Sequence, residues 1–178
     1  AFKANHSELT ESEFRIIADH MRAITIGLAD GVIPSNEGRG YVMRKLIVDI
    51  TDLEIRAGFE KPVIHTFVDV VVEVLKSPYP ELVAKASEIK LLVQRIEEAF
   101  IKVRRERVPE FQNAISSVKN NAEELGKLLF LYRDTYGVPL PTLDAVALSA
   151  GTAGPVLSSS HKYYEIAMEE QKNRSRAG

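Results

Sequence analysis

An apolar repeat in the middle of the chain limits how the chain can fold more than any other feature. Within residues 82–103, apolar side chains recur in alternating steps of four and three positions. This spacing places them along one face of a single helix for about three heptads. The members of this apolar seam are Leu82, Ala86, Ile89, Val93, Ile96, Phe100 and Val103. Because proline lacks a backbone N–H and clashes with the preceding turn, Pro109 predicts the end of this helix.

The seam needs a partner surface, which either other helices of the chain or a second chain can provide. Charged residues of this segment lie off the seam and are expected in solvent; they are Glu88, Arg95, Glu98, Lys102 and Arg105. Short connections to neighbouring helical segments favour packing within one chain over an intermolecular coiled coil. The pattern predicts an all-α protein, an antiparallel bundle of about six helices.

The segments before the seam also carry helical signals. Thr10 and Glu13 form a capping-box pattern, and apolar residues in helical spacing follow as far as Leu28. A second helix is predicted over about 39–57, before a glycine in a C-cap position. Residues 62–76 are rich in valine, which favours a strand, but their length and spacing favour a helix, which is our prediction.

The segments after the seam predict shorter helices. One helix is expected over about 122–132; it ends at DTYGVPLP, where Gly137 can cap it. Thr142 is expected to cap a short helix that ends near residue 150. The sequence GTAGPVLSSS at 151–160 is expected to be a flexible connection, and a polar helix is expected to close the chain.

The composition excludes several classes of protein. The 178 residues contain no cysteine, which excludes a disulfide scaffold, a cysteine nucleophile and a thiolate metal site. No apolar run reaches the roughly 18 residues that a membrane helix needs. The formal net charge is -2, so any contact with nucleic acid has to be local. The four histidines are scattered and no nucleotide-binding or hydrolase motif is present, so we predict no catalytic residue and no metal ligand.

The stretch DGVIPSNEGRGYVMRK at 30–45 interrupts the helical pattern. On the residues alone, Ser35 or Asn36 would cap the following helix, and the glycines would only turn the chain. The alternative is a binding loop, in which Gly38 and Gly40 let the backbone approach a nucleic acid and basic residues meet its phosphates.

Three segments resemble one family, in the same order along the chain. RIIADHMRAITIGLADGVIPSNEGRGYVMRK is similar to the segment that follows the catalytic core of alanyl-tRNA synthetases. LYRDTYGVP resembles that family's L-Y-D-T-Y-G-F-P, and MEEQKNRSR resembles its M-x-x-Q-x-x-x-[AS]-R. The resemblance implies a fragment of a longer enzyme: a single helical tRNA-recognition domain over 1–178, with 120–178 as a candidate small subdomain.

The resemblance also implies a function. In this family the helical domain binds the acceptor stem of alanine tRNA and reads its G·U wobble pair during ATP-dependent aminoacylation. The residues expected to contact that pair are Asn36 and Asp134. The other tRNA-binding residues implied are Arg39, Arg44, Lys45, Gly38 and Gly40. The partners would be the acceptor stem of alanine tRNA and the catalytic core of the parent enzyme. The protein would be cytoplasmic and would not bind a membrane. ATP and Mg would belong to that core, so this chain would hold no cofactor and would be inactive alone.

The chemistry of an RNA stem suits these residue types. An A-form helix exposes base edges in its wide minor groove, where guanine offers its N2 amino group as a donor. In a G·U pair this amino group has no partner on the uracil. The carboxylate of Asp134 can accept from it, and the amide of Asn36 can both donate and accept. The nearby tyrosines are expected to pack within the protein rather than stack on bases; they are Tyr41, Tyr132 and Tyr136.

Two differences from the family pattern keep a second interpretation open. The family continues with further arginines where this chain has LIVDI at 46–50, which introduces an acid at Asp49. Arg133 lies where the family has tyrosine followed directly by aspartate, so either the helix ends before Arg133 or Asp134 faces an unusual direction. The missing arginines and the net charge of -2 favour a helical protein–protein interaction module that has lost tRNA binding. The intact PSNEGRGY and DTYG segments favour tRNA recognition more.

Overall fold

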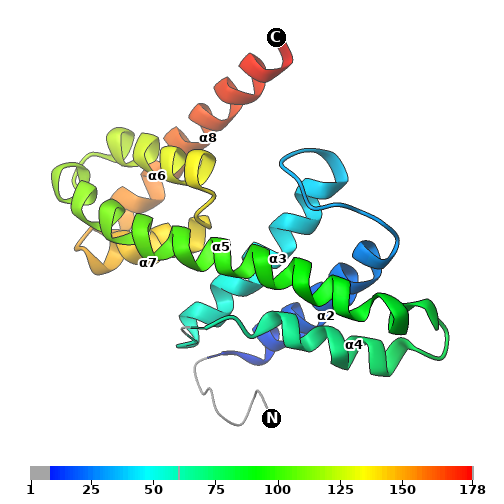
Figure 1. The fold of residues 1–178 in the computed structure, drawn as a ribbon. Helices are drawn as coiled ribbons and strands as arrows, with labels where there is room; N and C mark the ends of the chain where they lie inside the picture. Colours follow the sequence, from blue (N-terminus) through cyan, green and yellow to red (C-terminus); the bar gives the residue numbers. More distant parts are fainter. Residues whose placement is uncertain (1–8, 60, 178) are drawn as a thin grey trace. The chain divides into compact units, whose positions relative to one another are not determined.

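The computed structural model describes residues 9–59 and 61–177, and every regular element within them is helical (Figure 1). In chain order the elements are α2 (Glu11–Ala29), α3 (Gly38–Arg56), the 3-10 helix η1 (Ile64–Thr66), α4 (Phe67–Leu75), α5 (Glu81–Val118), α6 (Ala122–Tyr136), α7 (Leu140–Ser149) and α8 (Gly154–Ala177). The predicted all-α class is therefore confirmed, and the described residues form seven α-helices where the sequence predicted about six.

The chain divides into two compact units, Ala1–Lys102 and Val103–Gly178. The boundary falls within α5, so the first unit contains α2, α3, η1, α4 and the larger part of α5. The second unit contains the rest of α5 together with α6, α7 and α8. Each unit has a hydrophobic core of its own.

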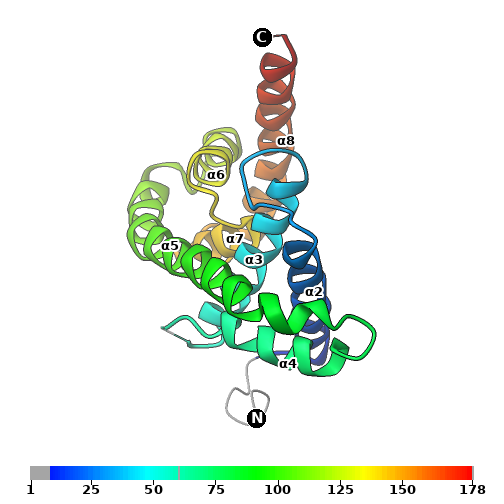
Figure 2. The same cartoon turned by 45° about the vertical axis from the view of Figure 1, so that its right-hand side comes forward.

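In the first unit, α2 packs against both α3 and α4. Figures 1 and 2 both show α4 alongside the first half of α5, where Lys90 of α5 pairs with Asp69 of α4 at 2.5 Å. The seam residues of α5 from Leu82 to Ile96 belong to this core or pack against it, and Val103 packs against the core of the second unit, so the predicted packing within the chain is confirmed. The fully buried core residues include Met21, Ile24, Ile47, Ile50, Ile64, Val68, Leu82 and Val93.

The start of α2 has the predicted capping box. The Thr10 hydroxyl accepts from the backbone N–H of Glu13 at 3.2 Å, and the Glu13 carboxylate accepts from the backbone N–H of Thr10 at 2.8 Å. Arg56, the last residue of α3, donates to the same carboxylate at 2.6 Å. The Thr10 backbone bond, together with Arg56, lowers the pKa of Glu13. The cap therefore also fixes the end of α3 to the start of α2.

The predicted end of the seam helix at Pro109 is wrong, because α5 continues through Pro109 to Val118. An interior proline costs about 3 kcal/mol of helix stability. Phe111 and Ile115 follow it and are fully buried in the core of the second unit. Burying side chains of this size contributes about 1.5–3 kcal/mol each, so packing outweighs the local cost.

Two helices of the second unit, α7 and α8, begin at other residues than the sequence predicted. Thr142 is not a cap: it is buried within α7, and Pro139 occupies the N-cap position. The flexible connection predicted at 151–160 is also wrong, since α8 begins at Gly154. Proline at the first turn of a helix costs no hydrogen bond, so Pro155 suits this start.

The first turns of α8 pack closely against α6. A Cβ on Gly126 of α6 would lie 2.5 Å from the carbonyl oxygen of Ser160 and 2.6 Å from Cβ of Tyr163. A glycine at this position therefore sets how near α6 and α8 can approach. In Figures 1 and 2 the last turns of α8 extend beyond α6 and α7.

Candidate nucleic-acid interface

The loop between α2 and α3 packs against the first turn of α3. A Cβ on Gly40 would lie 2.2 Å from the carbonyl oxygen of Ile33 and 2.8 Å from the backbone nitrogen of Ser35. Only glycine permits this contact, so packing within the chain is enough to explain a glycine at position 40. Gly38 begins α3 with a φ of 55°, in the left-handed region that glycine adopts most easily.

The alternative that Ser35 or Asn36 caps α3 is wrong. Glu37 occupies the N-cap position, and no side chain caps the helix there. The Ser35 hydroxyl instead donates to the carbonyl oxygen of Glu37 at 2.9 Å. The Asn36 side chain is exposed, and its Oδ1 accepts from Nη1 of Arg44 at 2.5 Å. An arginine of α3 therefore holds the loop asparagine in place.

Positive charge near this loop is only partly neutralised. Lys45 forms an ion pair with Asp49, one turn further along α3. This carboxylate neutralises the charge of Lys45 and so weakens its attraction for a phosphate. Within the described residues, Arg39 and Arg44 form no ion pair with a carboxylate, and the first turn of α3 contains no acid. The amide groups at the start of α3 add the positive end of its helix dipole.

Exposed apolar side chains lie beside the same loop. Ile33 is 77% exposed, Val42 48% and Tyr41 46%. The packing role predicted for Tyr41 is therefore wrong, because the side chain lies at the surface. The exposure of Ile33 and Val42 was not predicted, since residues of this type are most often buried.

In the second unit, α6 continues through Arg133 and Asp134 to Tyr136. The possibility that the helix ends before Arg133 is therefore excluded. Gly137, with a φ of 71°, ends α6 as predicted. Asp134 is exposed in the last turn and forms no hydrogen bond or ion pair within the described residues. A carboxylate is disfavoured at the negative end of a helix dipole, so a hydrogen-bond donor from outside the chain would stabilise the Asp134 carboxylate.

Aromatic packing holds the last turn of α6. The rings of Tyr132 and Phe111 lie edge to face at a centroid distance of 5.0 Å, and Tyr136 lies 5.2 Å from Tyr132. The Arg107 guanidinium lies 4.4 Å above the ring of Tyr136 and also pairs with Glu110. The packing roles predicted for Tyr132 and Tyr136 are confirmed.

Three acidic residues of the first unit are buried, Asp52, Glu54 and Glu97, and the sequence did not predict their burial. Glu97 is fully buried and accepts from the backbone amides of Val63 and Ile64, both at 2.7 Å, and from that of His65 at 3.1 Å. Glu54 is also fully buried, and its pKa is raised from 4.5 to about 9, first by burial and second by the charge of Glu97. Glu54 is therefore protonated at neutral pH and can donate to Glu97. No three acidic or histidine side chains of the described residues lie close enough together to bind a metal ion.

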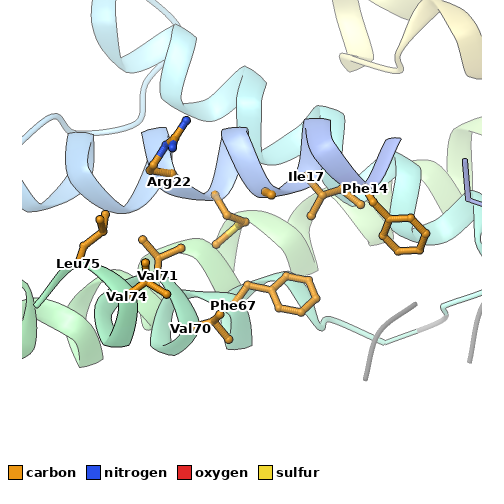
Figure 3. Close-up of a pocket in the computed structure, with 10 residues that line it drawn as sticks. Phe14, Ile17, Arg22, Phe67, Val70, Val71, Val74 and Leu75 are labelled. Carbon is orange, nitrogen blue, oxygen red and sulfur yellow. The ribbon is translucent and has the colours of Figure 1, made fainter. Parts of the chain in front are cut away.

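An apolar groove lies between α2 and α4 of the first unit (Figure 3). Its volume is about 380 Å³, and it is lined by Phe14, Ile17, Ala18, Met21, Arg22, Phe67, Val70, Val71, Val74 and Leu75. Figure 3 shows Phe14 and Phe67 toward one end and Arg22 toward the other. Its lining contains no acid–base pair, so the groove suits an apolar partner surface better than a reaction.

Comparison with known proteins identifies the family of the chain. A family model described as tRNA synthetases class II (A) matches residues 2–178. The chain is 35% identical over 166 residues to the alanine–tRNA ligase of Geobacillus thermodenitrificans and 34% identical over 166 residues to that of Geobacillus kaustophilus. It is 32% identical over 164 residues to the alanine–tRNA ligase of Staphylococcus aureus. Each match covers 92% of this chain and 18% of the relative, so the chain spans about a fifth of their length. None of the helices in the described residues has an apolar stretch of the length that a membrane crossing requires.

Proposed function

This chain belongs to the family of tRNA synthetases class II (A), and we propose that it is the part of an alanine–tRNA ligase that recognises the tRNA acceptor stem. The base pair that it reads is the G·U wobble pair of alanine tRNA. The observation that carries the proposal is the exposed amide of the loop residue Asn36, which Arg44 of α3 holds; neither Arg44 nor Arg39 of α3 has a carboxylate partner in the described residues.

The loop offers what the minor groove of an RNA stem requires. A short polar side chain can reach a base edge in this shallow groove, while Arg39 and Arg44 can approach phosphates on either side. The uncapped amides at the start of α3 can also face a phosphate. Exposed Tyr41 adds a flat surface for a ribose or a base beside the loop.

Asp134 supplies the complementary acceptor. Its carboxylate is exposed at the end of α6, and no donor of the described residues competes for it. A guanine amino group that lacks a partner in its own base pair is a donor of the right kind. A hydrogen bond to a charged group contributes about 1.5–3 kcal/mol, which corresponds to at least tenfold discrimination.

Aminoacylation itself is proposed for other parts of the parent ligase, in the cytoplasm. ATP and Mg²⁺ would bind there, and this chain alone would not charge tRNA. The apolar groove between α2 and α4 is a surface on which such parts of the parent enzyme could pack.

A filter-binding titration tests the proposal directly. An acceptor minihelix with the G·U pair is compared with one that has G·C at the same position, at fixed salt. We expect the chain to prefer G·U, and we expect Asp134→Asn to reduce that preference about tenfold. Glu123→Gln, an exposed acid at the other end of α6, is the matched control and should leave the preference unchanged.

The second candidate function is a helical interaction module without tRNA binding. The observation that favours it is the apolar groove, which an amphipathic helix of another protein could fill. Equal binding of the G·U and G·C minihelices by the unmodified chain would favour this candidate and reject the first.

A further inference from the structure

We infer that Arg44 is a positioning residue: by holding Oδ1 of Asn36, it presents the Nδ2 amino group of Asn36 to the RNA, so that Asn36 reads the stem as a donor. The inference rests on the proposed function and assigns to Arg44 a role different from the phosphate contact that the family resemblance implied.

The polarity of the contact follows from the chemistry of the two side chains. A guanidinium group has only donors, so the amide atom that faces it has to be the oxygen. Nη1 of Arg44 lies 2.5 Å from Oδ1 of Asn36. The amide group is planar, and its nitrogen therefore lies on the side away from that contact. Within the described residues Nδ2 donates no hydrogen bond, and the Asn36 side chain is exposed.

The geometry of the loop keeps this orientation in place. Arg44 belongs to α3, which is a rigid element, whereas Asn36 lies in the loop before it. The Ser35 hydroxyl bonds to the Glu37 carbonyl at 2.9 Å, and the Gly40 contact holds the same stretch against α3. The backbone on both sides of Asn36 is thus fixed, and Arg44 fixes its side chain.

A fixed donor changes what Asn36 can recognise. An amide that turns freely can accept from the guanine amino group as well as donate to an acceptor. An Nδ2 group that faces the groove would repel the guanine amino group and select a carbonyl oxygen, a ring nitrogen or a ribose hydroxyl.

The positioning role and the phosphate role predict different effects of the same substitution. A residue that neutralises a phosphate affects all stems equally, and its loss lowers the slope of log K against log salt by about 0.7–0.9. A residue that orients a reading group affects the preference between stems and leaves the slope unchanged.

The test is a titration of both minihelices at several salt concentrations with the full chain and two arginine variants. We expect Arg44→Ala to reduce the preference for G·U about fivefold at an unchanged salt slope. Arg39→Ala is the matched control on the same helix, since Arg39 has neither a hydrogen bond nor an ion pair from its side chain in the described residues. It should weaken binding of both stems alike and lower the slope.

Two conservative variants separate orientation from simple loss of an arginine. Arg44→Lys can still donate to Oδ1 of Asn36 and should restore most of the preference. Asn36→Asp keeps the partner of Arg44 but has no donor to offer, so it should lose the preference as fully as Asn36→Ala. A preference that survives in Asn36→Asp would overturn the donor assignment.

An NMR measurement without RNA distinguishes the failure of this inference from the failure of the proposed function. The side-chain NH₂ resonances of Asn36 should shift when Arg44 is replaced by alanine and remain when Arg39 is replaced. Unshifted resonances, or an Arg44→Ala variant that lowers the slope and keeps the preference, would overturn the inference alone. A chain that never prefers G·U would overturn the proposed function, and the readout role of Arg44 with it.

Discussion

Replacing Glu54 by glutamine should make the stability of the first unit less dependent on pH. Glu54 is fully buried beside Glu97, and its pKa is raised from 4.5 to about 9 by burial and by the charge of its neighbour. The folded chain therefore binds this proton more tightly than the unfolded chain does. The stabilisation is complete below about pH 4.5 and is lost progressively as the pH rises toward 9.

The size of the effect follows from the two pKa values. Each pKa unit corresponds to about 1.4 kcal/mol. Between the unfolded value of 4.5 and neutral pH, keeping the proton on Glu54 therefore costs about 3 kcal/mol of stability. Glutamine needs no proton, and its amide nitrogen is a donor that the Glu97 carboxylate can accept from. Any cost of fitting the amide does not depend on pH, so it cancels from the trend.

Urea unfolding followed by far-UV circular dichroism measures this trend. The stability of Glu54→Gln relative to the unmodified chain should increase by roughly 2–3 kcal/mol between about pH 5 and pH 7. Glu88→Gln, on the exposed face of α5, is the control for replacing a carboxyl group by an amide. A difference that stays flat across this range, or that falls as the pH rises, would refute the assignment of a protonated Glu54.

Three further substitutions test the packing. Gly40→Ala should destabilise the first unit by about 1–3 kcal/mol in urea unfolding, because its Cβ would lie 2.2 Å from the Ile33 carbonyl oxygen. Gly154→Ala, where a Cβ would meet nothing within 4 Å, should be neutral or stabilising and is its control. Pro109→Ala should raise the thermal midpoint, since α5 is helical there and alanine restores a hydrogen bond; an unchanged or lower midpoint would contradict this. Thr10→Ala should cost about 1 kcal/mol in thermal unfolding through loss of the α2 cap, and an unchanged stability would contradict the capping role.

The helix ends that the sequence predicted correctly are those with a local end signal. The capping box at Thr10 and the left-handed Gly137 mark their helix ends through contacts of a few residues, which a sequence contains in full. The continuation of α5 through Pro109 depends instead on the burial of Phe111 and Ile115 by other helices. A local sequence pattern does not show how much this burial stabilises the helix, so helix propensity alone placed the end of α5 wrongly at Pro109.

The candidate site shows the same division. The family resemblance indicated Asn36 and Asp134, and both residues are exposed; their contact with RNA stays a prediction. The bond from Arg44 to Asn36 was not predictable, because it depends on how the loop folds back along α3. The burial of Glu97 was not predictable either, since the amides that it accepts from lie more than 30 residues earlier in the chain.

The charge around the loop bears on how this chain would obtain its selectivity. The net charge is -2, and Lys45 forms an ion pair with Asp49. Arg39 and Arg44 of α3 are then the cations near the loop that have no carboxylate partner in the described residues. Two phosphate contacts give a salt slope of only about -1.4 to -1.8. Phosphate attraction of that size adds little affinity and no sequence preference. Most of the binding free energy that this surface contributes would then come from hydrogen bonds to base edges, so discrimination between stems should be large relative to overall affinity. If Arg44 serves Asn36 rather than a phosphate, the slope should be smaller still.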